Sequence, residues 1–143
     1  MENSDQTRRD RLTLEAINPK DGKPISVYIP QTLIVNRGKR SFGEAYTIRD
    51  IIPYVLKTPT SIFEGLRDER DEDRTTSGWR CYCGIPSMSY NSKGESYQTK
   101  PGLVFLVFVN SEHVVYNWRW EQADQNHDRF PEDHENRFRD RIL

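Results

Sequence analysis

The chain has 143 residues and a formal net charge of −1, from 21 basic and 22 acidic side chains. This length is typical of one domain and argues against a repeat array or a two-domain enzyme. Hydrophobic residues make up 34% and aromatic residues 11% of the chain, which predicts a small core rich in rings. No apolar run is long enough to span a bilayer, and residues 1–10 are polar and charged. We therefore expect a disordered leader over residues 1–10 and a cytoplasmic protein with no membrane partner.

The charge is distributed unevenly along the chain. Residues 1–60 carry 10 basic and 7 acidic side chains, whereas residues 61–143 carry 11 basic and 15 acidic side chains. A diffuse basic field of the kind that attracts nucleic acid is therefore absent, and any such binding needs a local patch.

The predicted domain, residues 11–143, begins with strand-like segments. Leu12–Ile17 and Ile25–Ile29 alternate in the manner of strands, and the residues between them are typical of turns. These segments predict an N-terminal β-hairpin. Thr32–Val35 is expected to add a short strand before a basic loop.

The segment around residue 50 has helical spacing. Apolar residues recur at intervals of three and four from Ile48 to Leu56, with Asp50 as the expected N-cap and Pro53 in the first turn. Thr58–Pro59 is a second start signal, because an N-cap residue precedes proline at the first helical position. Two short helices are predicted, the second over Ser61–Arg67.

The second half of the chain reads as a sheet. After a charge-rich connector at residues 68–78, strands are predicted over Trp79–Ile85, Leu103–Val109 and Val114–Glu121. The last two are separated by Asn110–His113, a short turn that favours an antiparallel hairpin. Pro86–Pro101 is expected to be a long polar loop. The charged C-terminal tail, residues 122–143, hints at a short terminal helix over Arg137–Leu143. The predicted class is α+β, with short helices packed on a curved antiparallel sheet.

The sequence lacks the strong local signatures of metal or cofactor enzymes, such as glycine-rich phosphate loops and HExxH. Cys81 and Cys83 would share one face of a strand, but a Cys-x-Cys pair cannot complete a zinc site unaided. The three histidines would help only if they came close in the fold. We expect the thiols to be small core residues, with no metal and no cofactor.

Arginine and aromatic side chains concentrate on the predicted sheet. Alternation places Arg80 and Tyr82 on one face of the first strand, opposite Cys81 and Cys83. On the third strand, alternation predicts two faces, one with Tyr116, Trp118 and Trp120 and the other with Val115, Asn117, Arg119 and Glu121. The sequence does not fix which of these faces lies beside Arg80 and Tyr82.

Such a set suits phosphodiester chemistry. A guanidinium neutralises the charge of the phosphorane, a ring stacks a base, and His113 or a tyrosine moves protons. In RNA the 2′-hydroxyl supplies the nucleophile, so no metal is needed. The alternative is structural: the arginines pair with the many acids, the tryptophans pack against the helices, and His113 is a solvated turn residue.

The order of elements resembles the barnase/EndoU/colicin/RelE superfamily of small ribonucleases, and in particular its compact branch in phage and polymorphic-toxin proteins. The likeness is carried by IIPYVLKTPTSIFEG (51–65), WRCYCG (79–84), VFLVFVN (104–110) and VVYNWRW (114–120). It implies a core over about residues 46–121, a curved antiparallel sheet after the helices, RNA as the substrate, and an antitoxin or immunity protein as a possible partner.

The resemblance also implies site residues. Arg80 matches the family's basic position, and Asn117 and Arg119 lie on the strand that commonly holds a polar catalytic group. This chain departs from the pattern in two places, because the helical segment has no histidine and Tyr116–Arg119 replaces a Thr-x-Tyr-like ending. The prediction is a metal-independent ribonuclease-like, toxin-type domain. Its candidate catalytic residues are Arg80, Tyr82, His113, Tyr116, Asn117 and Arg119. The alternative is a non-catalytic protein-interaction domain on a degenerate nuclease scaffold.

Overall fold

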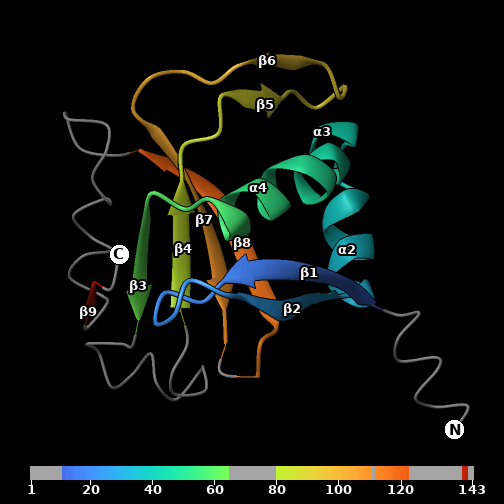
Figure 1. The fold of residues 1–143 in the computed structure, drawn as a ribbon. Coiled ribbons are helices and arrows are strands. Elements are labelled where there is room, and N and C mark those ends of the chain that lie inside the picture. Colours follow the sequence, from blue (N-terminus) through green and yellow to red (C-terminus); the bar gives the residue numbers. More distant parts are fainter. Residues whose placement is uncertain (1–10, 65–79, 111, 123–139, 142–143) are drawn as a thin grey trace, which may run out of the picture.

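The computed structural model describes residues 11–64, 80–110, 112–122 and 140–141. The predicted leader, the connector at residues 68–78, Trp79 and most of the C-terminal tail lie outside the described residues. The fold is α+β with an N-terminal hairpin, as predicted (Figure 1). The elements, in chain order, are β1 (Arg11–Ile17), β2 (Pro24–Pro30), α2 (Gln31–Gly38), α3 (Phe42–Tyr46), a π-helical turn η1 (Thr47–Ile51), α4 (Ile52–Lys57), β3 (Ser61–Glu64), β4 (Arg80–Gly84), β5 (Met88–Tyr90), β6 (Ser96–Gln98), β7 (Leu103–Val109), β8 (Val115–Gln122) and β9 (Asp140–Arg141).

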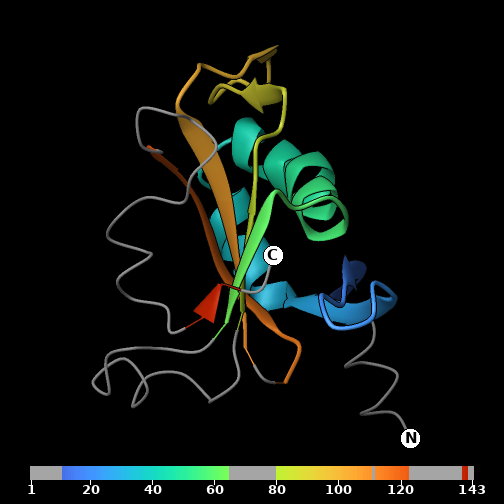
Figure 2. The ribbon, with the colours of Figure 1, turned by 60° about the vertical axis from the view of Figure 1, so that its left-hand side comes forward.

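The central sheet has the strand order β8-β7-β4-β3-β9, and every neighbouring pair in it is antiparallel. The predicted strands over residues 79–85, 103–109 and 114–121 are confirmed within the described residues, as is the β7–β8 hairpin. The helices and the β1–β2 hairpin lie on the same side of this sheet (Figure 2). Between them is the main core, which includes Ile52, Val55, Tyr82, Phe105 and Trp118.

The opposite face of the sheet is also apolar. It carries a second cluster of buried side chains, namely Phe63, Cys81, Cys83, Val104, Leu106 and Phe108. The central strands are therefore buried on both faces, which explains why β7 is apolar along its whole length.

The N-terminal hairpin forms with Leu14 opposite Val27, and its turn is closed by a 2.8 Å hydrogen bond from the Asn18 N–H to the Lys23 carbonyl. Ala16 and Ile29 are buried against the main core. The hairpin also touches the central sheet, because the Tyr28 N–H donates to the His113 carbonyl over 3.0 Å and Tyr28 forms a parallel bridge with Val114.

The short strand predicted over Thr32–Val35 is wrong, because these residues lie within the helix α2. Pro30 ends β2, and it has no N–H with which to continue a ladder. Leu33 and Ile34 then pack against the main core from the helix. Tertiary contacts outweigh the strand preference of this β-branched segment.

The helical stretch begins earlier than predicted. Ser41, and not Asp50, is the N-cap, and its hydroxyl accepts a 3.1 Å hydrogen bond from the Glu44 N–H. Helical structure then runs through α3, η1 and α4. The π-helical turn ends at Ile51, two residues before Pro53, where it helps the chain pass a residue that has no N–H to donate.

The second predicted helix, Ser61–Arg67, is also wrong in its described part. Ser61–Glu64 forms β3, in which Ile62 pairs with Tyr82 and Phe63 with Cys81. Ile62 belongs to the main core and Phe63 to the second cluster. A strand between two apolar layers buries consecutive side chains in this way, whereas one helix face does not.

Two further predictions need correction. Asp140–Arg141, within the predicted terminal helix, forms β9 beside β3, and the rest of that segment lies outside the described residues. The predicted loop Pro86–Pro101 contains the hairpin β5–β6, which reverses at Asn91–Glu95. Among the described residues, no helix has the length and apolar character needed to cross a membrane.

Candidate functional site

The sequence-predicted residues on β4 lie on the helix-facing side of the sheet. Tyr82 is 0% exposed, and its hydroxyl donates a 2.9 Å hydrogen bond to the Ile17 carbonyl. Burial raises the pKa of Tyr82, an effect that the nearby Arg80 guanidinium partly offsets. Arg80 lies 3.4 Å from Glu64, measured from Nε to the carboxylate. Tyr82 is therefore a core residue with a satisfied hydroxyl, out of reach of a base or a phosphate.

The predicted faces of β8 are changed by a β-bulge. Phe108 pairs with Asn117 and Val109 with Val115, so Tyr116 is the extra residue. Tyr116 consequently packs on the second cluster, with its ring 6.0 Å from that of Phe108. The prediction that Tyr116 shares a face with Trp118 and Trp120 is wrong, because both tryptophans pack in the main core. Val115 lies on the tryptophan face instead.

Arg119 lies on the same side of the sheet as Tyr116. It pairs with Leu106 across the ladder, and its guanidinium lies 5.1 Å from the centroid of the Phe108 ring. It also forms an ion pair with Glu121 on the same strand. The sheet thus separates Arg119 and Tyr116 from Arg80 and Tyr82, and one substrate cannot contact both pairs from one face.

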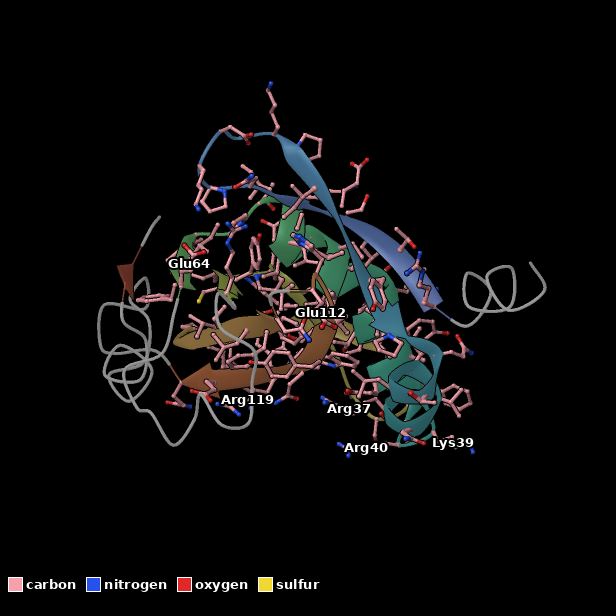
Figure 3. The ribbon with its side chains drawn as sticks, turned by 90° about the horizontal axis from the view of Figure 1, so that it is seen from below. Arg37, Lys39, Arg40, Glu64, Glu112 and Arg119 are labelled. Atoms are coloured by element: carbon pink, nitrogen blue, oxygen red, sulfur yellow. The ribbon has the colours of Figure 1, made fainter. Side chains whose placement is uncertain are left out.

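Asn117 belongs to a polar cluster that the sequence did not predict, formed by Arg37, Glu44, Asn117 and Trp118. Arg37 donates to the Glu44 carboxylate over 2.9 Å, to Asn117 Oδ1 over 3.1 Å and to the Trp118 carbonyl over 2.9 Å. The Trp118 indole N–H donates to the same Glu44 oxygen over 2.8 Å. In Figure 3, Arg37 reaches from the end of α2 towards β8, while Lys39 and Arg40 lie at the periphery. Arg37 and Glu44 are mostly buried and are bonded to each other and to β8, which indicates a structural role.

His113 lies in the β7–β8 turn, with a backbone φ of +65°. Its N–H donates to the Asn110 carbonyl and its carbonyl accepts from Tyr28, so the backbone of His113 ties the turn to β2. Of the six predicted residues, two lie on the helix-facing side of the sheet, two on the opposite face, one in the Arg37 cluster and one in a turn. They are Arg80 and Tyr82, Tyr116 and Arg119, Asn117, and His113, respectively. They do not form one constellation.

The described residues hold no group of three or more histidine, cysteine, aspartate or glutamate side chains arranged to bind a metal. Cys81 and Cys83 are buried thiols, and their sulfur atoms lie 3.9 Å apart. The prediction that they share one face of the strand is confirmed.

A different feature has the shape of a binding site. A cleft of about 250 Å³ lies between two walls. One wall is formed by η1 and α4, and the other by β5 together with the segment that joins β4 to β5. We call this cleft the tyrosine cleft, and its lining residues are Asp50, Ile51, Tyr54, Pro86, Ser87, Met88 and Tyr90. Tyr54 and Met88 are 49% and 43% exposed.

One wall of the tyrosine cleft is fixed by a polar network. The Tyr90 hydroxyl donates to Asp50 Oδ2 over 2.6 Å, and Arg49 donates to both oxygens of Asp50, over 2.9 and 2.7 Å. These donors, Arg49 first, hold the pKa of Asp50 below its ordinary value of 3.8, so its carboxylate is ionised at neutral pH. The rings of Tyr46 and Tyr90 pack with centroids 5.3 Å apart, and the Arg49 guanidinium lies 4.5 Å over Tyr46.

Sequence reasoning missed the tyrosine cleft because its walls are far apart in the chain. One signal was present, since Asp50 and Tyr54 are four residues apart in a segment predicted to be helical and therefore share a helix face. The other wall depends on a hairpin within a segment that composition marked only as a polar loop.

Comparison with known proteins finds no matching family model, no matching curated protein and no matching solved structure.

Proposed function

We propose that this chain is a non-catalytic interaction domain that binds a segment of a partner protein in the tyrosine cleft. The observation that carries the proposal is the exposure of Tyr54 and Met88 on the walls of an open cleft. Large apolar side chains left in water around a concavity are typical of protein interaction sites, where tyrosine and methionine are enriched. The Asp50–Tyr90 hydrogen bond holds one wall in place before a partner binds.

Catalysis is supported less well by the geometry. The residues that the sequence nominated for RNA cleavage lie on both faces of the sheet and in separate clusters. Arg119 is paired with Glu121, Arg80 lies beside Glu64, and Tyr82 is fully buried. A general acid–base mechanism needs its groups within hydrogen-bond reach of one reacting phosphate.

A second candidate remains metal-independent RNA cleavage, with an antitoxin or immunity protein as a further partner. The observation that favours it is the order of elements, because helices precede the sequential antiparallel strands β3, β4, β7 and β8. This is the order that the resemblance to small ribonucleases implies. For either function we propose a cytoplasmic setting, which is supported by Cys81 and Cys83 being thiols and not a disulfide.

A peptide selection on the full chain tests the interaction proposal. A displayed library is enriched on the wild-type protein, and the selected peptides are titrated against the double variant Tyr54→Ala/Met88→Ala. The control is Tyr97→Ala, which removes a tyrosine that is 42% exposed on β6 and does not line the cleft. We expect the double variant to weaken binding at least about tenfold and the control to leave it unchanged. Failure to enrich any peptide, or equal binding by the double variant, would contradict the proposal.

An RNA assay separates the second candidate. Labelled RNA of mixed sequence is incubated with the wild type, Arg80→Ala and Arg119→Ala in the presence of EDTA. We expect all three proteins to leave the RNA intact. Cleavage by the wild type that either substitution abolishes would replace the interaction proposal with the ribonuclease candidate.

A further inference from the structure

The charge of the tyrosine cleft points to the chemistry of its ligand. Of the seven described residues that line the cleft, Asp50 is the one with a formal charge. Its carboxylate lies beside the tyrosine that it binds, Tyr90, and one helical turn from Tyr54. The remaining walls, including Ile51, Pro86 and Met88, are largely apolar. A carboxylate among rings and aliphatic groups is complementary to a cation with an apolar stem.

The carboxylate of Asp50 keeps capacity for another donor. Oδ2 accepts from Tyr90 and from Arg49 Nη2, whereas Oδ1 accepts from Arg49 Nε. A carboxylate oxygen has two acceptor positions, so one position on Oδ1 is unused by the described residues. The Arg49 partner is itself in water, with a side chain that is 63% exposed, and does not line the cleft.

Beside the tyrosine cleft, the guanidinium of Arg49 already lies between a tyrosine ring and Asp50. Arg49 lies 4.5 Å from the centroid of the Tyr46 ring while it donates to both oxygens of Asp50. Tyr46 in turn packs against Tyr90, the ring on the cleft side. A planar cation between a tyrosine face and Asp50 is therefore an arrangement that these side chains already accommodate.

We infer that the partner segment enters the tyrosine cleft with an arginine side chain, whose stem packs against Ile51 and Met88 and whose guanidinium binds Asp50. This inference rests on the proposed function. Arginine fits better than lysine, because guanidinium is weakly hydrated, planar and able to stack on rings, whereas an ammonium is a strongly hydrated point charge that loses more solvation against these largely apolar walls. The cleft volume of about 250 Å³ suits one long side chain.

The test changes the arginine of the ligand. Peptides selected on the full chain are resynthesised with arginine changed to lysine or to citrulline, which keeps the shape of arginine and removes its charge. Each peptide is titrated against the wild type and Asp50→Asn. The matched control is Glu15→Gln, which neutralises an exposed acid on β1, outside the tyrosine cleft. Backbone amide spectra of every variant confirm that it is folded.

We expect citrulline to weaken binding to the wild type and to Glu15→Gln at least about tenfold, and lysine to weaken it measurably. Asp50→Asn should bind the arginine and citrulline peptides almost equally. Selected peptides without arginine, or equal affinities of the arginine and citrulline peptides for the wild type, would overturn the inference. The proposed function would survive that result if Tyr54→Ala/Met88→Ala still abolished binding. If no peptide binds through the cleft, both proposals fall.

Discussion

The guanidinium of Arg37 lies 4.4 Å from the centroid of the Trp118 ring and also donates to the Trp118 carbonyl. This one side chain fastens α2 to β8, the edge strand of the central sheet. The Trp118 N–H is satisfied as well, since it donates to Asn117 Oδ1 over 2.9 Å. The Arg37 cluster thereby occupies backbone groups that an edge strand would otherwise leave open to another chain.

Removing Arg37 should destabilise the fold more than a surface substitution does. Arg37 and Glu44 are 15% and 22% exposed, so Arg37→Ala leaves a mostly buried carboxylate without its cation. We expect a loss of about 2–3 kcal/mol in the free energy of unfolding, measured by urea denaturation. Arg37→Lys should recover little of it, because lysine cannot make three directed bonds from one plane. Arg40→Ala, which removes an exposed arginine just beyond α2, is the control, and an equal effect there would contradict the role of the Arg37 cluster.

Gly43 is the position where α3 touches the β5–β6 hairpin. A Cβ at Gly43 would lie 2.0 Å from the Asn91 carbonyl oxygen and 2.9 Å from its carbonyl carbon, both of which are backbone atoms. We expect Gly43→Ala to cost about 3 kcal/mol of stability in thermal or urea unfolding, because the hairpin must move away. Gly38→Ala meets nothing within 4 Å and should be neutral or gain up to about 1 kcal/mol. Similar behaviour of the two variants would show that the hairpin does not pack on α3 as described.

The backbone of His113 predicts an unusual response to substitution. Its φ of +65° suits glycine, and Asn110 Oδ1 holds the turn by accepting from the Glu112 and Val114 N–H groups. We expect His113→Gly to leave stability unchanged or raise it by up to about 1 kcal/mol, and His113→Val to lower it by about 1–2 kcal/mol. Calorimetric unfolding of both variants measures this order. The reverse order would mean that the imidazole makes contacts worth more than the backbone strain.

Burial of Tyr82 predicts a loss of stability at alkaline pH. The fold raises the pKa of Tyr82 above its ordinary value of 10.0, chiefly because burial disfavours the phenolate. The folded state therefore holds this proton more tightly than the unfolded state does. The corresponding stabilisation is complete below pH 10 and is lost as the pH rises from 10.0 towards the folded-state pKa.

Tyr82→Phe isolates this effect. The substitution removes the hydrogen bond to Ile17 and should cost about 1 kcal/mol at neutral pH. Above pH 10 its stability should fall less steeply than that of the wild type, as measured by urea denaturation at successive pH values. The pKa of Tyr90 is raised as well, in its case by Asp50, so both proteins should still lose some stability as the pH rises. Parallel slopes for the two proteins would rule out Tyr82 as the buried titrating group.

The sheet was predictable because its strands carry their own signal. The alternation of Cys81 and Cys83 with Tyr82 places thiols on one face and the phenol on the other, as found. The continuous apolar run of β7 indicated burial on both faces. A short turn then joined β7 to β8. These features depend on neighbours in the sequence, so the chain alone determines them.

The errors arose where distant contacts decide. Thr32–Val35 is rich in β-branched residues, yet it is helical because Leu33 and Ile34 pack on the main core and Arg37, just beyond them, is held by Glu44 and Trp118. Ser61–Glu64 has helix start signals, yet it is a strand because Ile62 and Phe63 meet two apolar layers. The predicted alternation along β8 fails at Tyr116, because a bulge opposite Phe108 and Val109 places this ring on the other face from Trp118 and Trp120. The two apolar layers and the bulge depend on residues that are distant in the sequence, so neighbouring residues do not predict them.

The placement of β5–β6 has a consequence for how this protein can change. The hairpin interrupts the connection between the neighbouring strands β4 and β7, and with the segment before it supplies one wall of the tyrosine cleft from outside the main sheet. The other wall belongs to helices whose inner face is core. Met88 is 43% exposed, so substitutions there should change the surface of the tyrosine cleft at little cost to folding.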